Sequence, residues 1–289
     1  MSRVCPKLLV SIEFYHTFRR WLNWDNPKDI NEKINWLKLY SDTSLWTRCA
    51  DKYAVREYVE ECGFPEILVK LYGKWDKAED IDWDSLPNQF VLKVNNGSGD
   101  IIVCADKTCI DKTSLVKKFE ALLKKSFANY NVEPHYTPMK PCIIAEELLD
   151  ARLQPIESQS LIDYKIWCFN GKPYYIWACY DRVGDSVSVA TYDLDWNRHD
   201  EKSADVPHYH IATKNIPKPR SLDKMLKVAA KLSEGIPQVR VDLYEVNDQP
   251  YFGEMTFTSA GGFNDFYTQD FLNELGSYCD LSLAPRKQK

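Results

Sequence analysis

Apolar residues recur every three or four positions in four stretches of the chain, and this spacing predicts amphipathic helices. The four stretches are 30–40, 50–63, 111–127 and 221–235. Asp51 is a suitable N-cap for the second helix, and Gly63 is a suitable stop. Lys52 then falls in the first turn, where the helix dipole disfavours a cation. Its side chain is therefore expected to point at an anion.

Alternating or continuous apolar runs in other stretches predict strands. Residues 90–104 are predicted to form two strands around a polar loop, and 141–149 a short buried strand that ends in carboxylates. Asn170-Gly171 lies between two aromatic strands within 161–181 and is a strong signal for a two-residue hairpin turn. Residues 238–262 are predicted to form a hairpin followed by a glycine-rich turn.

The stretch 182–220 is polar and contains three prolines, and it is predicted to form long loops. Along the whole chain the predicted strands come in hairpins, and the helices are interspersed without a βαβ rhythm. This order predicts an α+β fold with antiparallel sheets rather than a doubly wound parallel sheet.

Composition narrows the classes of protein that fit this pattern. The chain has 289 residues, 44% of them hydrophobic, which is enough for one large domain or two modest lobes. The formal net charge is −5 and no basic stripe is visible, which argues against binding of nucleic acid. Nine cysteines without a C-x-x-C pair are predicted to be free thiols of a cytoplasmic protein.

The N-terminal region contains a short apolar run at 8–12, too short for a membrane span, and an aromatic and basic stretch at 14–24. Two placements are open for the second stretch. We favour a helix packed on the rest of the protein; peripheral contact with a membrane surface is the alternative.

The last predicted hairpin brings two carboxylates together. Side chains alternate along a strand, so Arg240, Asp242 and Tyr244 are expected to share one face. A turn centred on Asp248 places Asp242 opposite Glu254. By the same count Arg240 lies opposite Thr256, and Phe252, Glu254 and Thr256 share a face.

Two opposed carboxylates repel each other, and a hard divalent cation would turn this penalty into a binding site. Magnesium takes carboxylate oxygens together with nucleotide phosphates. The alternative is an exposed face with unrelated charges.

Lys93 is an unusual residue for the interior of a strand. Phe90, Leu92 and Val94 are expected to point one way and Lys93 the other. The following loop, "NNGSGD", offers backbone N–H groups that can approach an anion closely. It is neither a Walker A loop nor a dinucleotide fingerprint, and a plain tight turn is the alternative.

The order of these parts resembles the ATP-grasp superfamily. Seven segments are similar to one branch of it, the TupA-like ATP-grasp proteins of teichuronopeptide and surface-polysaccharide biosynthesis. The segments are "NEKINWLKLY", "DKYAVREYV", "FVLKVNNGSG", "IIAEELL", "DYKIWCFNGKP", "YDLDWN" and "VRVDLYEVNDQPYFGEMTFT". The resemblance runs from about residue 28 to 275.

This resemblance implies an α+β ATP-grasp fold, in which two α+β lobes with antiparallel sheets clamp a nucleotide. It implies a helical N-terminal segment at 1–63, a small lobe at 64–147 and a large lobe with the metal-binding hairpin at 148–280. Typical relatives carry a full α/β domain before the first lysine, and the short segment here cannot supply one.

The resemblance also implies roles for particular residues. Lys52 and Lys93 match the two lysines that hold the α- and β-phosphates of ATP. The flexible loop that closes over the phosphates is matched by Asn96, Gly97, Ser98 and Gly99.

Further residues match the adenine and reaction sites of the superfamily. Glu146 and Glu147 fall where adenine is received, with Leu149 nearby for a backbone contact. Lys165 matches a basic residue with a phosphate role, and Arg240 an arginine placed near the acyl phosphate.

Asp242 and Glu254 match the carboxylates that bind Mg²⁺, and Thr256 stands where most members have an asparagine, which puts the geometry of a second metal in question. Asp100 follows the phosphate loop and would repel polyphosphate unless it points outward.

The implied cofactors are ATP and Mg²⁺. The implied activity is an ATP-dependent carboxylate–amine ligase that works through an acyl phosphate and joins an amino acid or amine to a sugar acid or peptide. The partners are a small-molecule or glycan acceptor with a carboxylate and an amine donor. The sequence leaves the acceptor, the amine and the oligomeric state open.

Three alternatives remain beside the ligase. The "DLD" at 193–195 could be read as the D-x-D metal motif of a glycosyltransferase. An ATP-grasp core also supports kinases that phosphorylate a hydroxyl. A non-catalytic nucleotide-binding module would follow if Thr256 and Asp100 disable the chemistry.

Overall fold

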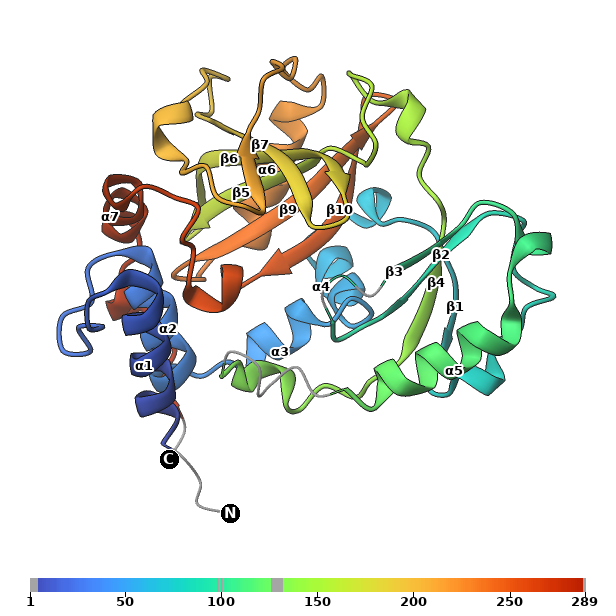
Figure 1. The fold of residues 1–289 in the computed structure, drawn as a ribbon, viewed down its shortest axis with the longest axis horizontal. Coiled ribbons are helices and arrows are strands. Elements are labelled where there is room, and N and C mark those ends of the chain that lie inside the picture. Colours follow the sequence, from blue (N-terminus) through green and yellow to red (C-terminus); the bar gives the residue numbers. More distant parts are fainter. Residues whose placement is uncertain (1–4, 98, 100, 126–131, 288–289) are drawn as a thin grey trace.

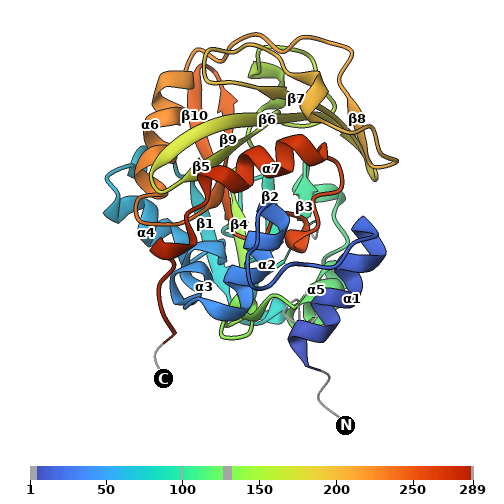
Figure 2. The ribbon, with the colours of Figure 1, turned by 90° about the vertical axis from the view of Figure 1, so that its left-hand side faces the viewer.

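The computed structural model describes residues 5–97, 99, 101–125 and 132–287, and it contains two sheets (Figures 1 and 2). The smaller sheet has four antiparallel strands in the order β1-β4-β2-β3. Its strands are β1 (Leu71–Trp75), β2 (Phe90–Val94), β3 (Ile101–Cys104) and β4 (Ile143–Glu146).

The larger sheet has six strands in the order β10-β9-β5-β6-β7-β8. All neighbours are antiparallel except β7 and β8, which are parallel. Its strands are β5 (Asp163–Phe169), β6 (Lys172–Val183), β7 (Ser186–Tyr192), β8 (Tyr209–Ile211), β9 (Val239–Val246) and β10 (Gln249–Thr256). The expected α+β fold with antiparallel sheets is therefore confirmed, with one parallel edge strand.

Helices pack against both sheets and between them. Figure 1 places α5 beside the small sheet, α3 and α4 near the junction of the two sheets, and α1, α2 and α7 at the opposite end of the molecule. No helix in the described part of the chain is long and apolar enough to cross a bilayer. The helices are α1 (Pro6–Phe18), α2 (Ile30–Tyr40), α3 (Ser44–Ala50), α4 (Val55–Glu61), α5 (Lys112–Leu123), α6 (Leu222–Leu232) and α7 (Gln269–Tyr278).

Each sheet has its own hydrophobic cluster. The small sheet buries Phe90 and Leu92 of β2 against Phe119 of α5. The large sheet's cluster also contains apolar side chains of α2, α3 and α4, including Leu37 and Val59. α2, α3 and α4 are thus part of the large sheet's core, whereas Val10 and Phe14 of α1 belong to a separate small cluster.

The helix predicted over 50–63 is shorter in the structure and covers Val55–Glu61. α3 ends at Ala50 and α4 begins at Val55, and the carboxylate of Asp51 accepts the backbone N–H groups of Tyr53 and Ala54 in between. Asp51 therefore caps a turn rather than the first residue of a helix. The other predicted helices are present, although α5 ends at Leu123 and Phe127 lies outside the described residues.

The prediction of long loops over 182–220 is wrong for part of this stretch. It contains β7 and β8, and β7 continues directly from β6 as a hairpin. Val187 and Val189 of β7 are buried. The alternation of valine with serine is a strand pattern that the polar serines concealed.

All nine cysteines are free, as predicted, and six of them are buried. The chain contains no disulfide among them.

The last hairpin has the predicted pairing of Asp242 with Glu254, but its turn and one of its strands differ from the prediction. Its two-residue turn is Asn247-Asp248, both with positive φ, so the turn centre lies between them rather than on Asp248. A bulge at Gly253 then adds one residue to β10 and restores the pairing of Glu254 with Asp242. A Cβ on Gly253 would lie 2.9 Å from the carbonyl oxygen of Asp242.

The bulge also separates Phe252 from Glu254. Phe252 pairs with Leu243, and both belong to the large sheet's hydrophobic cluster. The expectation that Phe252 shares a face with Glu254 and Thr256 is wrong, because a one-residue bulge reverses the side-chain alternation beyond it.

Candidate functional site

Lys52 lies at the junction of the two sheets. It follows α3, and its Nζ donates a hydrogen bond to the carbonyl oxygen of Gly97, just after β2. The same Nζ is 3.8 Å from Oε2 of Glu254 on β10. Burial lowers the pKa of Lys52, while the negative charge of Glu254 opposes this shift. One ammonium group thus contacts both the predicted phosphate loop and the predicted metal-binding hairpin.

Two polar side chains fix Lys52 in this position. Asn95 Nδ2 donates to Asp51 Oδ2 at 2.7 Å, and Asn95 Oδ1 accepts the backbone N–H of Cys142 at 2.8 Å. The backbone N–H of Lys52 donates to the carbonyl oxygen of Asn95 at 3.0 Å. The turn that carries Lys52 is therefore tied to the ends of β2 and β4.

Lys93 on β2 forms an ion pair with Glu146 on β4. The Nζ–Oε2 distance is 2.5 Å, and Arg56 NH1 lies 3.2 Å from the other carboxylate oxygen. Sequence reasoning did not single out Arg56. It is four residues after Lys52, and this helical spacing was the signal that could have found it. The structure thus places three cations around Glu146 and Glu254.

The remaining nucleotide-site candidates lie near this cluster. Asn96 and Gly97 are buried, and Gly99 is exposed with φ +80°. Ser98 and Asp100 lie outside the described residues. Glu147 is exposed, its backbone N–H donates to the carbonyl oxygen of Lys70 at 2.9 Å, and Leu149 is half-buried.

A second charged cluster lies on the large sheet. Arg240 donates from Nε to Asp242 Oδ1 at 2.7 Å and from NH2 to Oδ2 at 2.8 Å, a bidentate pair. Lys165 lies directly across from Asp242 on β5, with its Nζ 2.5 Å from Oδ2. Burial opposes ionisation of Asp242, but the charges of Arg240 and Lys165 outweigh it and lower the pKa of this carboxyl.

Asp163 completes this cluster and was missed from the sequence. Its Oδ2 accepts from Lys165 Nζ, and its buried Oδ1 has no hydrogen-bond partner in the part of the chain that the structure describes. Burial raises the pKa of Asp163. Asp163 and Lys165 are two residues apart on one strand, so alternation alone would have placed them on one face.

The predicted metal ligands approach each other around Arg240. Thr256 Oγ1 donates to Glu254 Oε1 at 3.2 Å and accepts from Arg240 NH2 at 3.2 Å. The same NH2 is 4.0 Å from Glu254 Oε1. The Arg240 guanidinium therefore lies between Asp242 and Glu254, where the pairing of the two carboxylates predicted a divalent metal cation.

The donor set suits Mg²⁺ in its chemistry, since two carboxylates and a hydroxyl provide hard oxygen ligands. Among the described residues, no three His, Cys, Asp or Glu side chains gather into a metal-binding group. A magnesium ion here would therefore take further oxygens from water and from phosphates, as Mg²⁺ commonly does.

A hydrogen-bonded chain connects Arg240 with α2. Arg240 NH1 donates to Ser259 Oγ at 2.8 Å, and Ser259 Oγ donates to Asn264 Oδ1 at 2.6 Å. Asn264 Nδ2 donates to Asn31 Oδ1 of α2 at 2.7 Å. All four side chains are buried, so each link lacks competition from bulk water.

The segment 259–264, which follows β10, is held by one stripe of α2. Asn35 Nδ2 donates to the carbonyl oxygen of Gly262 at 2.8 Å, and Lys38 Nζ to that of Gly261 at 2.6 Å. Asn31 is on the same stripe, one turn before Asn35. Gly262 has φ +88°, and a Cβ there would lie 2.7 Å from Asn35 Nδ2.

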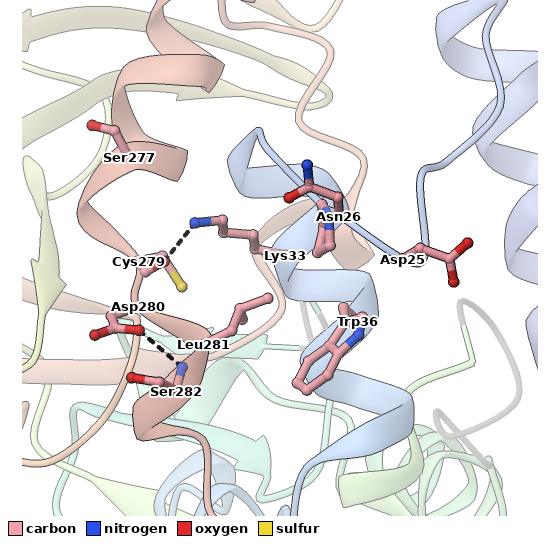
Figure 3. Close-up of a pocket in the computed structure, with 10 residues that line it drawn as sticks. Asp25, Asn26, Lys33, Trp36, Ser277, Cys279, Asp280, Leu281 and Ser282 are labelled. Carbon is pink, nitrogen blue, oxygen red and sulfur yellow. Dashed lines mark hydrogen bonds between the residues drawn. The ribbon is translucent and has the colours of Figure 1, made fainter.

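Two surface cavities lie elsewhere. One, of about 540 Å³, contains Lys33 and Trp36 of α2 together with residues of the chain after α7 (Figure 3). Figure 3 shows Lys33 pointing toward Cys279, whose carbonyl oxygen accepts from Nζ at 2.6 Å. The other, of about 360 Å³, is lined by residues such as Trp21 and Asn273. Neither cavity contains a predicted site residue.

The chain is similar to the D-alanine–D-alanine ligase from Bacillus anthracis, with 16% identity and a TM-score of 0.46 over 84% of this chain and 71% of that one. The D-alanine–D-alanine ligase from Helicobacter pylori has 12% sequence identity to this chain and a TM-score of 0.45, over 90% of this chain and 68% of that one.

N5-carboxyaminoimidazole ribonucleotide synthetase from Thermus thermophilus gives 10% identity and a TM-score of 0.43 over 79% of this chain. The match covers 52% of the synthetase, about half of its length. A comparison with curated proteins found no match.

A family model described as TupA-like ATP-grasp matches residues 32–280. The match begins in α2 and includes both charged clusters and the hairpin of β9 and β10. It covers most of the chain, and the two sheets described above agree with the fold that the sequence resemblance implied. This chain belongs to the TupA-like family of the ATP-grasp superfamily.

Proposed function

We propose that the protein is an ADP-forming ligase that uses ATP to join a carboxylate to an amine. One observation supports this most: Lys52 lies 3.8 Å from Glu254, so a cation beside the glycine loop meets a carboxylate of the large sheet's hairpin. Cations for phosphate and carboxylates for a metal are thereby on facing sides of one junction. This is the arrangement that phosphoryl transfer requires.

On the nucleotide side, Lys52 and Lys93 bind the α- and β-phosphates, and the segment Asn96 to Gly99 closes over them. Glu146, Glu147 and Leu149 receive the adenine. Glu146 accepts from both Lys93 and Arg56, so Lys93 can turn toward phosphate while Arg56 still neutralises the carboxylate. The exchange replaces one ion pair by another and leaves no buried charge alone.

Asp242, Glu254 and Thr256 would hold Mg²⁺ together with the phosphates. When bound, the ion neutralises charge on the triphosphate and orients its γ-phosphoryl group. The three cationic contacts of Asp242 keep this carboxylate ionised and fixed in orientation, which a ligand for a divalent cation needs.

In the first step, an oxygen of the acceptor carboxylate attacks the γ-phosphorus and the bond to the β–γ bridging oxygen breaks. The products are an acyl phosphate and ADP. In the second step, the nitrogen of the amine attacks the acyl carbon, the bond from that carbon to the phosphate oxygen breaks, and phosphate leaves with the proton that the nitrogen loses as the amide forms. Arg240 stabilises the oxyanion that develops on the acyl oxygen. Lys165 positions Asp242 and adds positive charge close by.

The acceptor we propose is a sugar acid or a peptide, and the amine is an amino acid or a small amine, in the assembly of a surface polysaccharide. This part rests on the sequence resemblance to TupA-like proteins. We further propose that the lobes are 64–147 and 148–280, with a helical segment at 1–63, and that the protein acts in the cytoplasm.

The glycosyltransferase alternative has less support. Asp193 of the "DLD" accepts from the backbone N–H groups of Asp195 and Asn197, and its Oδ2 lies 3.1 Å from His199 Nε2. The motif is therefore a locally satisfied turn, as Asx turns commonly are. The kinase alternative shares the nucleotide site and differs only in the acceptor.

An experiment with hydroxylamine distinguishes these activities. The full-length protein is incubated with ATP, Mg²⁺, hydroxylamine and a panel of sugar acids and peptides. The proposal expects ADP and an acyl hydroxamate that depend on the acceptor. A stable phosphorylated acceptor without hydroxamate indicates a kinase, and release of AMP rules out the acyl-phosphate route.

A further inference from the structure

α1 has apolar side chains on two opposite faces. Val10 and Phe14 point inward and are buried with Leu22, and this packing attaches the helix to the rest of the protein. The opposite face carries exposed apolar residues at helical spacing. These are Leu8, Leu9, Ile12 and Tyr15, with exposed fractions of 52, 44, 40 and 39%.

The chain after α1 extends this apolar face. Arg19 has a positive φ of 55° and ends the helix, with its N–H donating to the carbonyl oxygen of Tyr15 at 2.9 Å. The turn brings Trp21 back onto Tyr15, with ring centroids 4.7 Å apart and planes 26° from parallel. Trp21 is nevertheless 62% exposed. A large aromatic pair is thus held at the surface beside an arginine.

α1 is fixed rather than loosely attached. Arg20 NH1 donates to Glu32 Oε1 at 2.7 Å, and its NH2 donates to Asp29. The Arg20 guanidinium also lies 4.9 Å from the ring centroid of Phe14. These contacts connect the end of α1 to the start of α2, so the outward face stays exposed and does not turn inward.

Charge indicates what this face contacts. In residues 5–21 the exposed charges are those of Lys7, Arg19 and Glu13, a net +1, because Arg20 is paired with Asp29 and Glu32, whereas the whole chain has a formal net charge of −5. Lys7 and Arg19 are exposed. Exposed leucine and isoleucine with tryptophan, tyrosine and basic residues are the composition of helices that lie at a membrane surface. The acidic remainder of the chain would be repelled by an anionic surface, so contact is favoured through this segment.

We propose that α1 and Trp21 dock the protein on the surface of an anionic lipid bilayer. α1 has 13 residues and is about 20 Å long, which suits a helix lying in the headgroup plane and not one crossing the bilayer. Figure 1 shows α1 at the end of the molecule away from β1, β2 and β3 of the small sheet.

The test is co-sedimentation of the full-length protein with vesicles of phosphatidylcholine, with and without phosphatidylglycerol. Binding is expected only to the anionic vesicles and should weaken with added salt. Ile12→Glu should reduce the bound fraction by roughly tenfold, since it removes apolar contact and adds repulsion. Arg19→Glu should reduce it by roughly fivefold or more, through charge alone. Val183→Glu is the matched control, because Val183 is equally apolar and 62% exposed on β6.

Three results would overturn the proposal. The first is no sedimentation with either kind of vesicle. The second is an equal loss of binding in Ile12→Glu and Val183→Glu, which would indicate a general charge effect. The third is a dimer, seen by light scattering without lipid, that Ile12→Glu dissociates while vesicle binding is absent; this face would then contact a second copy of the chain. None of these measurements depends on the proposed ligase activity.

Discussion

Lys93 and Glu146 form an ion pair, with 2.5 Å between Nζ and Oε2, although the sequence resemblance assigned one to phosphate and the other to adenine. The strand order β1-β4-β2-β3 makes β2 and β4 neighbours and brings the two side chains together. With Arg56 on the other carboxylate oxygen, Glu146 holds both cations at the edge of the site. In the proposed nucleotide site, Glu146 thus balances one of the two positive charges beside it before any phosphate arrives.

Replacing Lys93 by methionine should weaken ATP binding by about tenfold or more, because a hydrogen bond to a charged group contributes roughly 1.5–3 kcal/mol. Isothermal titration calorimetry measures this change. Glu146→Gln is the companion variant, since it keeps Lys93 and releases it from its partner. If Lys93→Met binds ATP as tightly as the wild type, Lys93 serves only to neutralise Glu146.

Asp242→Asn should reduce the free energy of unfolding by about 3–5 kcal/mol, because Arg240 and Lys165 would stay buried beside a neutral group. Asp163→Asn should reduce the free energy of unfolding by clearly less. Burial already raises the pKa of Asp163, and Lys165 would still form its ion pair with Asp242. Urea unfolding of both variants provides the comparison. Equal losses in the two variants would contradict the central position that we assign to Asp242.

Asn31→Ala tests the chain from α2 to Arg240. The change leaves Asn264 without its acceptor and should cost about 1–3 kcal/mol of stability. It should also lower kcat with little change in the KM for ATP, because Arg240 loses a fixed orientation. Asn35→Ala is the matched control: Asn35 is equally buried and bonds to Gly262, but it is outside the chain to Arg240. Similar kcat values in the two variants would show that α2 acts on stability alone.

The buried side chain of His135 should make the free energy of unfolding depend on pH. It is buried against Trp46, its ring nitrogens have no hydrogen-bond partner among the described residues, and burial lowers its pKa to about 3. Between this value and the ordinary pKa near 6.5, the unfolded chain binds more protons at this site than the folded protein. Stability should therefore fall as pH falls through this window, by up to about 1.4 kcal/mol per pH unit.

His135→Phe keeps the ring and removes the titrating group. Urea unfolding at several pH values between 4 and 7 should give a shallower slope for the variant than for the wild type (~1 proton difference at most). Parallel slopes for the two proteins would mean that His135 is accessible to protons in the folded state.

The outline of the fold could be predicted from local patterns, whereas much of the site depends on contacts between distant segments. Alternation placed Arg240 and Asp242 on one face, and the structure agrees. The pairing of Asp242 with Glu254 is also confirmed, but only because a turn centre displaced by half a residue and the bulge at Gly253 offset each other. A hairpin's length therefore does not fix its register without knowledge of its bulges.

Other relationships could not be predicted from neighbouring residues. Lys165 faces Asp242 because β5 pairs with β9, two strands separated by more than 60 residues of chain. The ion pair of Lys93 with Glu146 depends on the same kind of non-local strand order. The polar stripe of Asn31 and Asn35 gave no signal in the sequence, since its partners are backbone and side-chain groups of a loop more than 200 residues later.

The central claim is that a carboxylate oxygen attacks the γ-phosphorus of ATP, and an isotope measurement tests it most directly. An acceptor found in the hydroxamate screen is labelled with ¹⁸O in its carboxylate and converted with ATP, Mg²⁺ and an amine, and the released phosphate is examined by mass spectrometry. Our account predicts that each phosphate carries one labelled oxygen from the acceptor. Amide formation with unlabelled phosphate would contradict an acyl-phosphate intermediate.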